Sequence, residues 1–111
     1  MAVRLEWDNF YRGGAPVTAA TKYTHTDSRK AGVRSINLSN DNDYPVKVKI
    51  WVVLAAGAAG KTNVLVPNWE VVAHGSRGWC GFEVLEKNDF IVVQSNYDNA
   101  LAVTINGALF G

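Results

Sequence analysis

The sequence predicts an all-β fold, an antiparallel β-sandwich of jelly-roll-like type with an extended N-terminal arm. In Pro45–Leu54, every even position from Val46 onward is aliphatic, whereas Lys47 and Lys49 occupy odd positions. Side chains alternate across a strand, so one row faces a core and the other begins in water. Similar short runs recur at near-regular spacing, separated by turn residues, and none has a helical period. The gaps are too short for the crossovers of parallel βαβ units, which need ~12 residues or more.

The first half of the chain gives three strand segments in order. Pro16–Thr24 is rich in threonine and is followed by a polar loop, His25–Gly32. Val33–Ser39 places aliphatic side chains on one face, and Asn40–Asp43 is a turn, because Asn and Asp close turns with their own side chains. The strong segment Val46–Leu54 comes next.

The second half gives four more segments. The small-residue loop Ala55–Lys61 leads into Thr62–Val72, which Pro67 interrupts and thereby marks as an edge strand or a bulge. Three further segments are separated by turns at residues 74–76, 86–89 and 96–99: Trp79–Leu85, Phe90–Ser95 and Leu101–Ile105. Phe82 and Val84 share one face of the first of these. The pattern therefore predicts seven or eight strands in a domain spanning residues 16–111.

Residues 1–15 differ from the rest, because charges alternate with three large aromatic residues ahead of the diglycine Gly13–Gly14. One interpretation is a frayed terminus or an irregular first strand. The other is an arm that docks its aromatic side chains on a neighbouring molecule, since large aromatics contribute much of an interface's energy.

Composition excludes several classes of protein. The 111 residues form one domain, and the net charge of +1 lacks the basic surplus of a nucleic-acid-binding protein. The single Cys80 excludes an internal disulfide, and no apolar run approaches the ~18 residues of a membrane span. Glu6 and Asp8 stand where a signal peptide would be apolar. We therefore expect a protein made in the cytoplasm that binds neither nucleic acid nor membranes.

The candidate chemical groups are sparse. Zinc needs three or four ligands at close spacing, and the chain offers only one cysteine and two distant histidines, His25 and His74. Each histidine is expected to be a solvated loop residue. A nucleophilic pair of Cys80 with either histidine is conceivable, but a buried thiol in a strand is the ordinary role of such a cysteine. We therefore expect no catalytic residues and no metal ligands.

Two other motifs have simpler explanations. The acidic Asp41 and Asp43 lack the spaced ligand series of a calcium loop and are expected to form a tight turn. The sequence Gly60-Lys61-Thr62 matches the end of a phosphate-binding loop, but Ala55 stands where its first glycine is required.

Four tryptophans are many for this length. Trp51 lies opposite the aliphatic row of its strand, and we expect it to be buried in packing. A carbohydrate-binding module is the alternative, and it would need Trp69 or Trp79 to be exposed.

The order of the strand and turn segments resembles the small β-sandwich virion proteins of tailed bacteriophages, which include capsid decoration (cement) proteins and related tail or fibre modules. The similarity runs from about Pro16 to the C-terminus, and the N-terminal arm and His74–Cys80 depart from it. The residues that carry it are Val33–Asn40, Pro45–Val53, Leu65–Pro67, the turn Val84–Asp89 leading into Phe90–Val93, and Leu101–Gly107.

The resemblance implies a non-enzymatic virion protein without a cofactor that binds and stabilises the capsid shell, with the major capsid protein or another virion protein as partner. It also implies a homotrimer, because decoration proteins often sit at symmetry axes. A tail, fibre or baseplate adaptor would share the fold and differ in its partner. The expected partner-binding residues all lie in the arm: Arg4, Trp7, Phe10, Tyr11 and Arg12.

Overall fold

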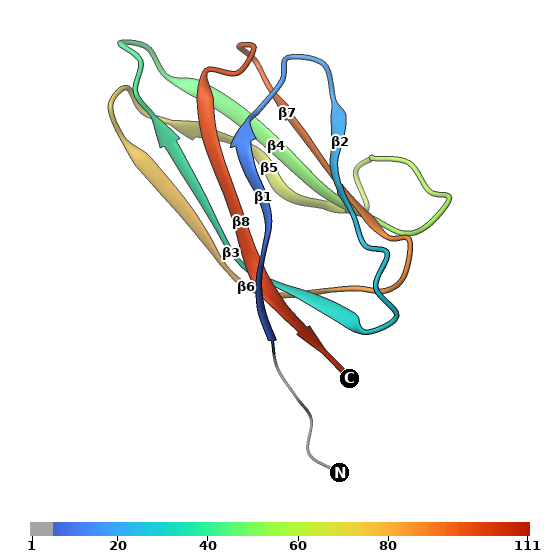
Figure 1. Ribbon diagram of the computed structural model, residues 1–111. Helices are drawn as coiled ribbons and strands as arrows, with labels where there is room; N and C mark the ends of the chain where they lie inside the picture. The colour runs from blue at the N-terminus through green and yellow to red at the C-terminus, as the bar shows by residue number, and fades with distance from the viewer. Residues whose placement is uncertain (1–5) are drawn as a thin grey trace.

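The computed structural model describes residues 6–111, which form eight β-strands and no helix (Figure 1). Within these residues no helix is long and apolar enough to cross a membrane. The strands are β1 (Glu6–Gly14), β2 (Ala20–Thr24), β3 (Lys30–Asn40), β4 (Val46–Val53), β5 (Val64–Val71), β6 (Ser76–Leu85), β7 (Phe90–Ser95) and β8 (Leu101–Phe110).

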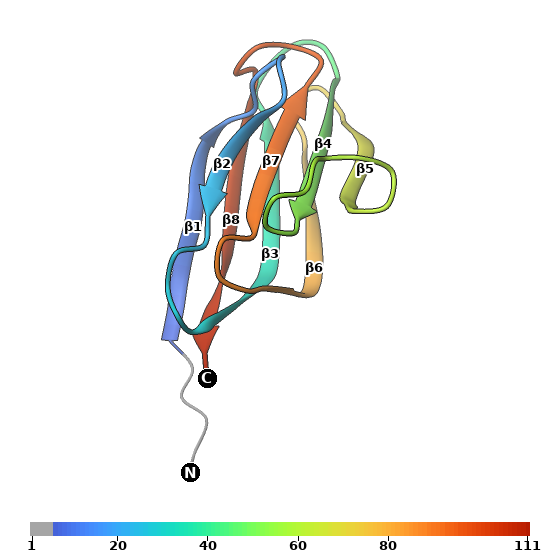
Figure 2. The ribbon, with the colours of Figure 1, turned by 90° about the vertical axis from the view of Figure 1, so that its right-hand side faces the viewer.

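The strands pack as two four-stranded antiparallel sheets, and the strands of each sheet are spread side by side in the view of Figure 2. Sheet A has the order β1-β8-β3-β6, and sheet B has the order β2-β7-β4-β5. Every connection along the chain crosses from one sheet to the other except the one between β4 and β5. Two sheets interleaved in this way make an eight-stranded jelly roll. The predicted fold class is confirmed.

The core lies between the sheets and is built from alternating aliphatic side chains. On β4, Val46, Val48 and Ile50 are fully buried, whereas Lys47 and Lys49 are exposed, as the sequence pattern predicts. Sheet A supplies the facing layer, in which Ile36 pairs with Ile105 and Leu38 with Val103. These four residues come from the two central strands of sheet A and therefore lie in the middle of the core.

Most predicted segments are confirmed, with shifted ends. Phe90–Ser95 is strand β7 itself, whereas β8 continues to Phe110, five residues beyond its predicted end. Pro67 does mark an edge: β5 is an outer strand of sheet B, and its register against β4 shifts near Pro67, where Asn68 has a φ of 52°.

The N-terminal segment differs from the predicted arm over residues 6–14. This stretch is strand β1, paired along its length with β8 from Glu6↔Leu109 to Gly14↔Ala102. The diglycine is part of that pairing and does not form a joint. Backbone hydrogen bonding to β8 and the burial of Phe10 hold the segment in sheet A. The alternative of an irregular first strand agrees with the structure, because a register shift interrupts β1 between Asn9 and Tyr11.

A second, smaller cluster lies on the outer face of sheet B. Trp51 is 9% exposed and packs with Val53 and Val92, so its predicted burial is confirmed. The connection between β4 and β5, residues 54–63, loops out beside this face (Figure 2).

The prediction that His25 is a solvated loop residue is wrong, because its side chain is fully buried. Its Nε2–H donates to the backbone carbonyl of Arg29, and its Nδ1 shares a 2.9 Å hydrogen bond with the hydroxyl of Tyr23. Burial raises the pKa of Tyr23, with smaller contributions from the nearby carboxylates of Asp8 and Asp27. Both ring nitrogens are satisfied, which is why the imidazole is tolerated in the interior.

The prediction that Cys80 is a buried thiol is also wrong, because this residue is exposed. It pairs with Ser35, whose neighbour Ile36 points into the core, so Cys80 points to the outer face of sheet A. The other histidine, His74, is exposed as expected.

We predict that Gly107→Ala destabilises the fold by about 3 kcal/mol, because a Cβ there would lie 1.9 Å from the carbonyl oxygen of Gly32 and 2.6 Å from the ring of Phe10. Urea unfolding measures the change. Gly60→Ala is the matched control: a Cβ at Gly60 meets nothing within 4 Å, so the free energy of unfolding should change by less than about 0.5 kcal/mol. Equal stabilities of the two variants would contradict this packing.

We also predict that Cys80 reacts with a maleimide in the native protein at a rate close to that of the urea-unfolded chain, because the thiol is exposed. Mass spectrometry follows the labelling, with Cys80→Ser as the blank. Labelling that required unfolding would show that the thiol is covered.

Candidate functional site

The candidate site is the outer face of sheet A. The register of the paired strands shows which side chains lie on this face. Residues paired across antiparallel strands share a face. Leu101, Val103 and Ile105 of β8 point into the core, so the residues between them point outward. Four rows of outward positions cross the sheet from β1 to β6: Gly14, Ala102, Ser39 and Ser76; Arg12, Thr104, Asn37 and Gly78; Asn9, Asn106, Ser35 and Cys80; and Trp7, Ala108, Gly32 and Val84.

Three of these rows are small and polar, and the fourth is apolar. Trp7 is 69% exposed, Phe82 48% and Val84 41%, which makes them the large apolar side chains of this face that meet solvent. The ring of Phe82 lies over Gly32, where a Cβ would stand 2.3 Å from a ring carbon. The ring centroids of Phe82 and Phe110 are 5.5 Å apart. A glycine at position 32 is therefore what lets Phe82 lie flat against the sheet.

Arg34 sits in the middle of this apolar end. A register irregularity in β3 between Val33 and Ser35 displaces it from the regular alternation. Its guanidinium carbon lies 5.8 Å from the ring of Trp7 and 5.5 Å from that of Phe82, so one cation contacts two aromatic rings. We call Trp7, Arg34, Phe82 and Phe110 the aromatic cluster.

The aromatic cluster forms a small apolar layer outside the core. Ala108 lies under it and is fully buried, although it does not belong to the core between the sheets. Tryptophan and arginine are the residue types most enriched in the energetically dominant positions of protein interfaces. The cluster is therefore a candidate contact surface.

The charged side chains at the strand positions of this face are basic. Arg12, Lys30 and Arg34 project from it, and within the described strands none of its outward positions is Asp or Glu. Lys30 has a carboxylate partner at the end of the face, 3.6 Å from Glu86. A second carboxylate, Asp41, lines the same hollow as Arg12 at the other end of the face, so carboxylates flank the basic residues at both ends.

The structure separates the predicted partner-binding residues. Trp7 and Arg12 share the outer face of sheet A, whereas the register shift turns Phe10 and Tyr11 inward. Phe10 is 6% exposed and stacks on Tyr23 at 4.8 Å, so it is unavailable to a partner. The hydroxyl of Tyr11 donates to the carbonyl of Gly14, and burial raises its pKa. Arg4 lies outside the residues that the structure describes.

Strand β1 is also held at its lower end by ion pairs. The Arg29 guanidinium contacts Glu6 at 2.6 Å and Asp27 at 2.9 Å. Hydrogen bonds from Arg29 hold the pKa of the Asp27 carboxyl well below its usual range, and the two carboxylates raise the pKa of Arg29. These contacts tie the start of β1 to the loop between β2 and β3.

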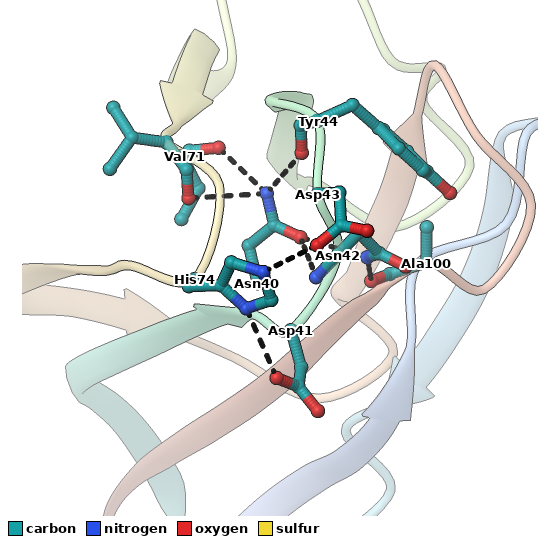
Figure 3. Close-up of polar contacts among 9 residues, drawn as sticks. Asn40, Asp41, Asn42, Asp43, Tyr44, Val71, His74 and Ala100 are labelled. Carbon is teal, nitrogen blue, oxygen red and sulfur yellow. Dashed lines mark hydrogen bonds and ion pairs between the residues drawn. The ribbon is translucent and has the colours of Figure 1, made fainter.

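A second polar group lies at the opposite end of the sandwich (Figure 3). The predicted turn at residues 40–43 is confirmed: the backbone N–H of Asn42 donates to the side-chain oxygen of Asn40. His74 lies between two carboxylates, 2.7 Å from Asp43 and 3.4 Å from Asp41. These contacts join the turn after β3 to the turn after β5.

Figure 3 also shows why this cluster is structural. The side-chain amide of Asn40 donates to the carbonyls of Tyr44, Val71 and Val72, and Asn42 donates to that of Ala100. The side chains thereby replace backbone pairing between three connections. Within residues 6–111 no group of three or more His, Cys, Asp and Glu side chains is arranged to hold a metal ion.

The tryptophans needed for the alternative carbohydrate-binding site are only partly exposed. Trp69 and Trp79 are half-buried against the core, and the Arg77 guanidinium carbon lies 4.2 Å from the ring of Trp69. Nothing in the sequence marks Arg34 or Phe110 as part of a site. The predicted contact residue Trp7 and the shared face of Phe82 and Val84 are the signals that point toward the aromatic cluster.

Comparisons with known proteins give structural likeness only. No family model matches the sequence, and no curated protein matches it. A chain of the T13 particle of infectious bursal disease virus (IBDV) aligns over 97% of this chain with a TM-score of 0.60 and 8% identity. A chain from the Gx strain of the same virus aligns over 99% with a TM-score of 0.58 and 10% identity.

This chain spans 30% and 33% of the length of those two viral chains. A chain of the Bacillus endospore appendages, disulfide-linked pili, has a TM-score of 0.48, which is too low to indicate a shared fold. At such identities the likeness shows the fold alone: residues 6–111 are a jelly-roll sandwich of a kind that also occurs in a virus particle.

Proposed function

We propose that this chain is a non-enzymatic structural protein of a virus particle, and that it acts by binding other virion proteins. The fold supports this proposal, because nearly the whole chain aligns with part of a protein of an icosahedral virus particle. The jelly roll also recurs in capsid domains generally. The outer face of sheet A supplies the surface through which such a protein would act.

Within that class, we propose a decoration or cement protein of a tailed bacteriophage that binds the major capsid protein. The segment order resembles such proteins, and the aromatic cluster is the observation that carries the contact surface. Trp7 and Phe82 offer apolar area, and Arg34 between them offers a cation to an acidic group on the shell. Binding across several shell subunits would stabilise the assembled shell by mass action.

Of the predicted contact residues, Trp7 and Arg12 keep this role in the proposal. Arg34 and Phe82 join them, and the buried Phe10 leaves the set. The rows of Ser, Asn, Thr and Gly beside the cluster would allow close approach of a second protein surface, because Arg12 is the one long side chain that projects from them.

We predict that Trp7→Ala and Phe82→Ala each weaken binding to purified phage heads lacking this protein by about thirtyfold or more, since a dominant interface aromatic contributes about 2 kcal/mol. Co-sedimentation with the heads measures binding, and urea unfolding confirms that each variant folds. Val72→Ala is the matched control: Val72 is 60% exposed at the other end of the molecule, and its loss should not change binding.

Wild-type binding of folded Trp7→Ala and Phe82→Ala would overturn the proposed surface. Binding to isolated tails and not to heads would overturn the decoration role in favour of a tail, fibre or baseplate adaptor, with the structural role retained.

We also predict a homotrimer, because decoration proteins at symmetry axes form closed cyclic assemblies. Sedimentation equilibrium of the full chain should give three times the 12.1 kDa chain mass. A chain that remains monomeric, both free and on the heads, would contradict the trimer.

A further inference from the structure

A groove lies on the outer face of sheet B, on the opposite side of the sandwich from the aromatic cluster. It consists of two hollows of about 180 and 330 Å³ that share Lys49 and Asn68. One extends toward Asn96 after β7, and the other toward Gly60 in the connection between β4 and β5. The groove therefore runs along the outward side of β4.

The charges lining this groove are all positive. Lys47, Lys49 and Lys61 line it, and no carboxylate does. Each of these lysines is exposed, and within residues 6–111 none is within ion-pair distance of an Asp or Glu. Lys47 and Lys49 come from alternate positions of one strand, so the strand itself sets their spacing along the groove.

The uncharged lining is suited to hydroxyl groups and ring faces. The side-chain amides of Asn68, Gln94 and Asn96 both donate and accept hydrogen bonds. That of Asn96 is oriented by the 2.8 Å hydrogen bond its oxygen accepts from the backbone N–H of Lys47. At the other end, an apolar floor is made by the exposed Pro67 and the half-buried Val64, whereas Trp51 is almost covered and contributes little to it.

We propose that this groove binds an acidic oligosaccharide, a chain of sugars that carry carboxylate or sulfate groups. The lysines would pair with the acidic groups, the amides with hydroxyls, and the apolar floor with the C–H faces of the rings. The site does not depend on the proposed function, because it lies on the other sheet and uses none of the same residues.

The groove fits other polyanions less well. Single-stranded nucleic acid needs open aromatic faces for its bases, and the aromatic side chain of this lining, Trp51, is only 9% exposed. An acidic peptide that added as a strand would need an open backbone edge. The groove lies over β4, whose edges are both paired, with β5 and β7.

The test is isothermal titration of the full chain with a galacturonic acid hexamer and a heparin-derived hexasaccharide, against maltohexaose as the neutral sugar. We expect binding of at least one acidic sugar and none of the neutral one. Lys49→Gln and Lys61→Gln should each weaken binding by about tenfold, the effect of losing one charge-assisted contact. Lys87→Gln, an exposed lysine of the turn after β6, is the matched control and should bind as wild type.

Further ligands and unfolding curves make the outcome decisive. A hexaglutamate peptide or a hexathymidylate that binds as tightly as the acidic sugars would overturn the proposal, because charge alone would then explain binding. No binding of either acidic sugar would overturn it too, as would equal losses in Lys87→Gln and Lys49→Gln. Urea unfolding shows that the variants are folded, and the shell-binding assay on Lys49→Gln should be unchanged, which separates this site from the one on sheet A.

Discussion

The pairing of β1 with β8 is the interaction on which the candidate surface depends. It adds a fourth strand to sheet A and brings Trp7 to the same face as residues from β3 and β6. The irregularity within β1 then sorts its aromatic side chains: Phe10 goes to the core and Trp7 to solvent. Strand β1 thus contributes one aromatic side chain to the core and another to the outer face. The ion pairs of Arg29 with Glu6 and Asp27 hold the N-terminal end of β1 in place.

The net charge is only +1, but the positive and negative side chains are distributed unevenly over the surface. Arginine and lysine project from the broad faces of both sheets, whereas many carboxylates, among them Asp27, Asp41 and Asp89, lie in the connections at the two ends. The face of sheet B has Glu70 opposite Lys47 as its acidic group in the described strands. Local fields of this kind decide which partners approach, and composition alone cannot reveal them.

The fold could be predicted from the sequence because its core strands are short aliphatic runs separated by turn residues, with alternation clearest over Val46–Ile50. β4 and β7 follow from Val46–Leu54 and Phe90–Ser95, where local pattern and tertiary burial agree. β1 could not be identified with certainty, since its charges and its shifted register obscure the period of two. The aromatic cluster lies further beyond prediction, because Trp7, Arg34 and Phe82 meet only through strand pairings between distant parts of the chain. The burial of His25 likewise depends on a carbonyl and a hydroxyl that no pattern marks.

The register of the outermost pair in sheet A has a practical corollary. Glu6 is opposite Leu109 and Lys30 is opposite Phe110, so the first described strand starts where the last one stops. Closely spaced strand ends make a domain amenable to circular permutation, since a short linker can bridge them without crossing a sheet. The same corner adjoins Trp7 and Phe110 of the aromatic cluster, so a cargo fused there would stand beside the proposed contact surface and clear of the turns around His74 at the far pole of the sandwich.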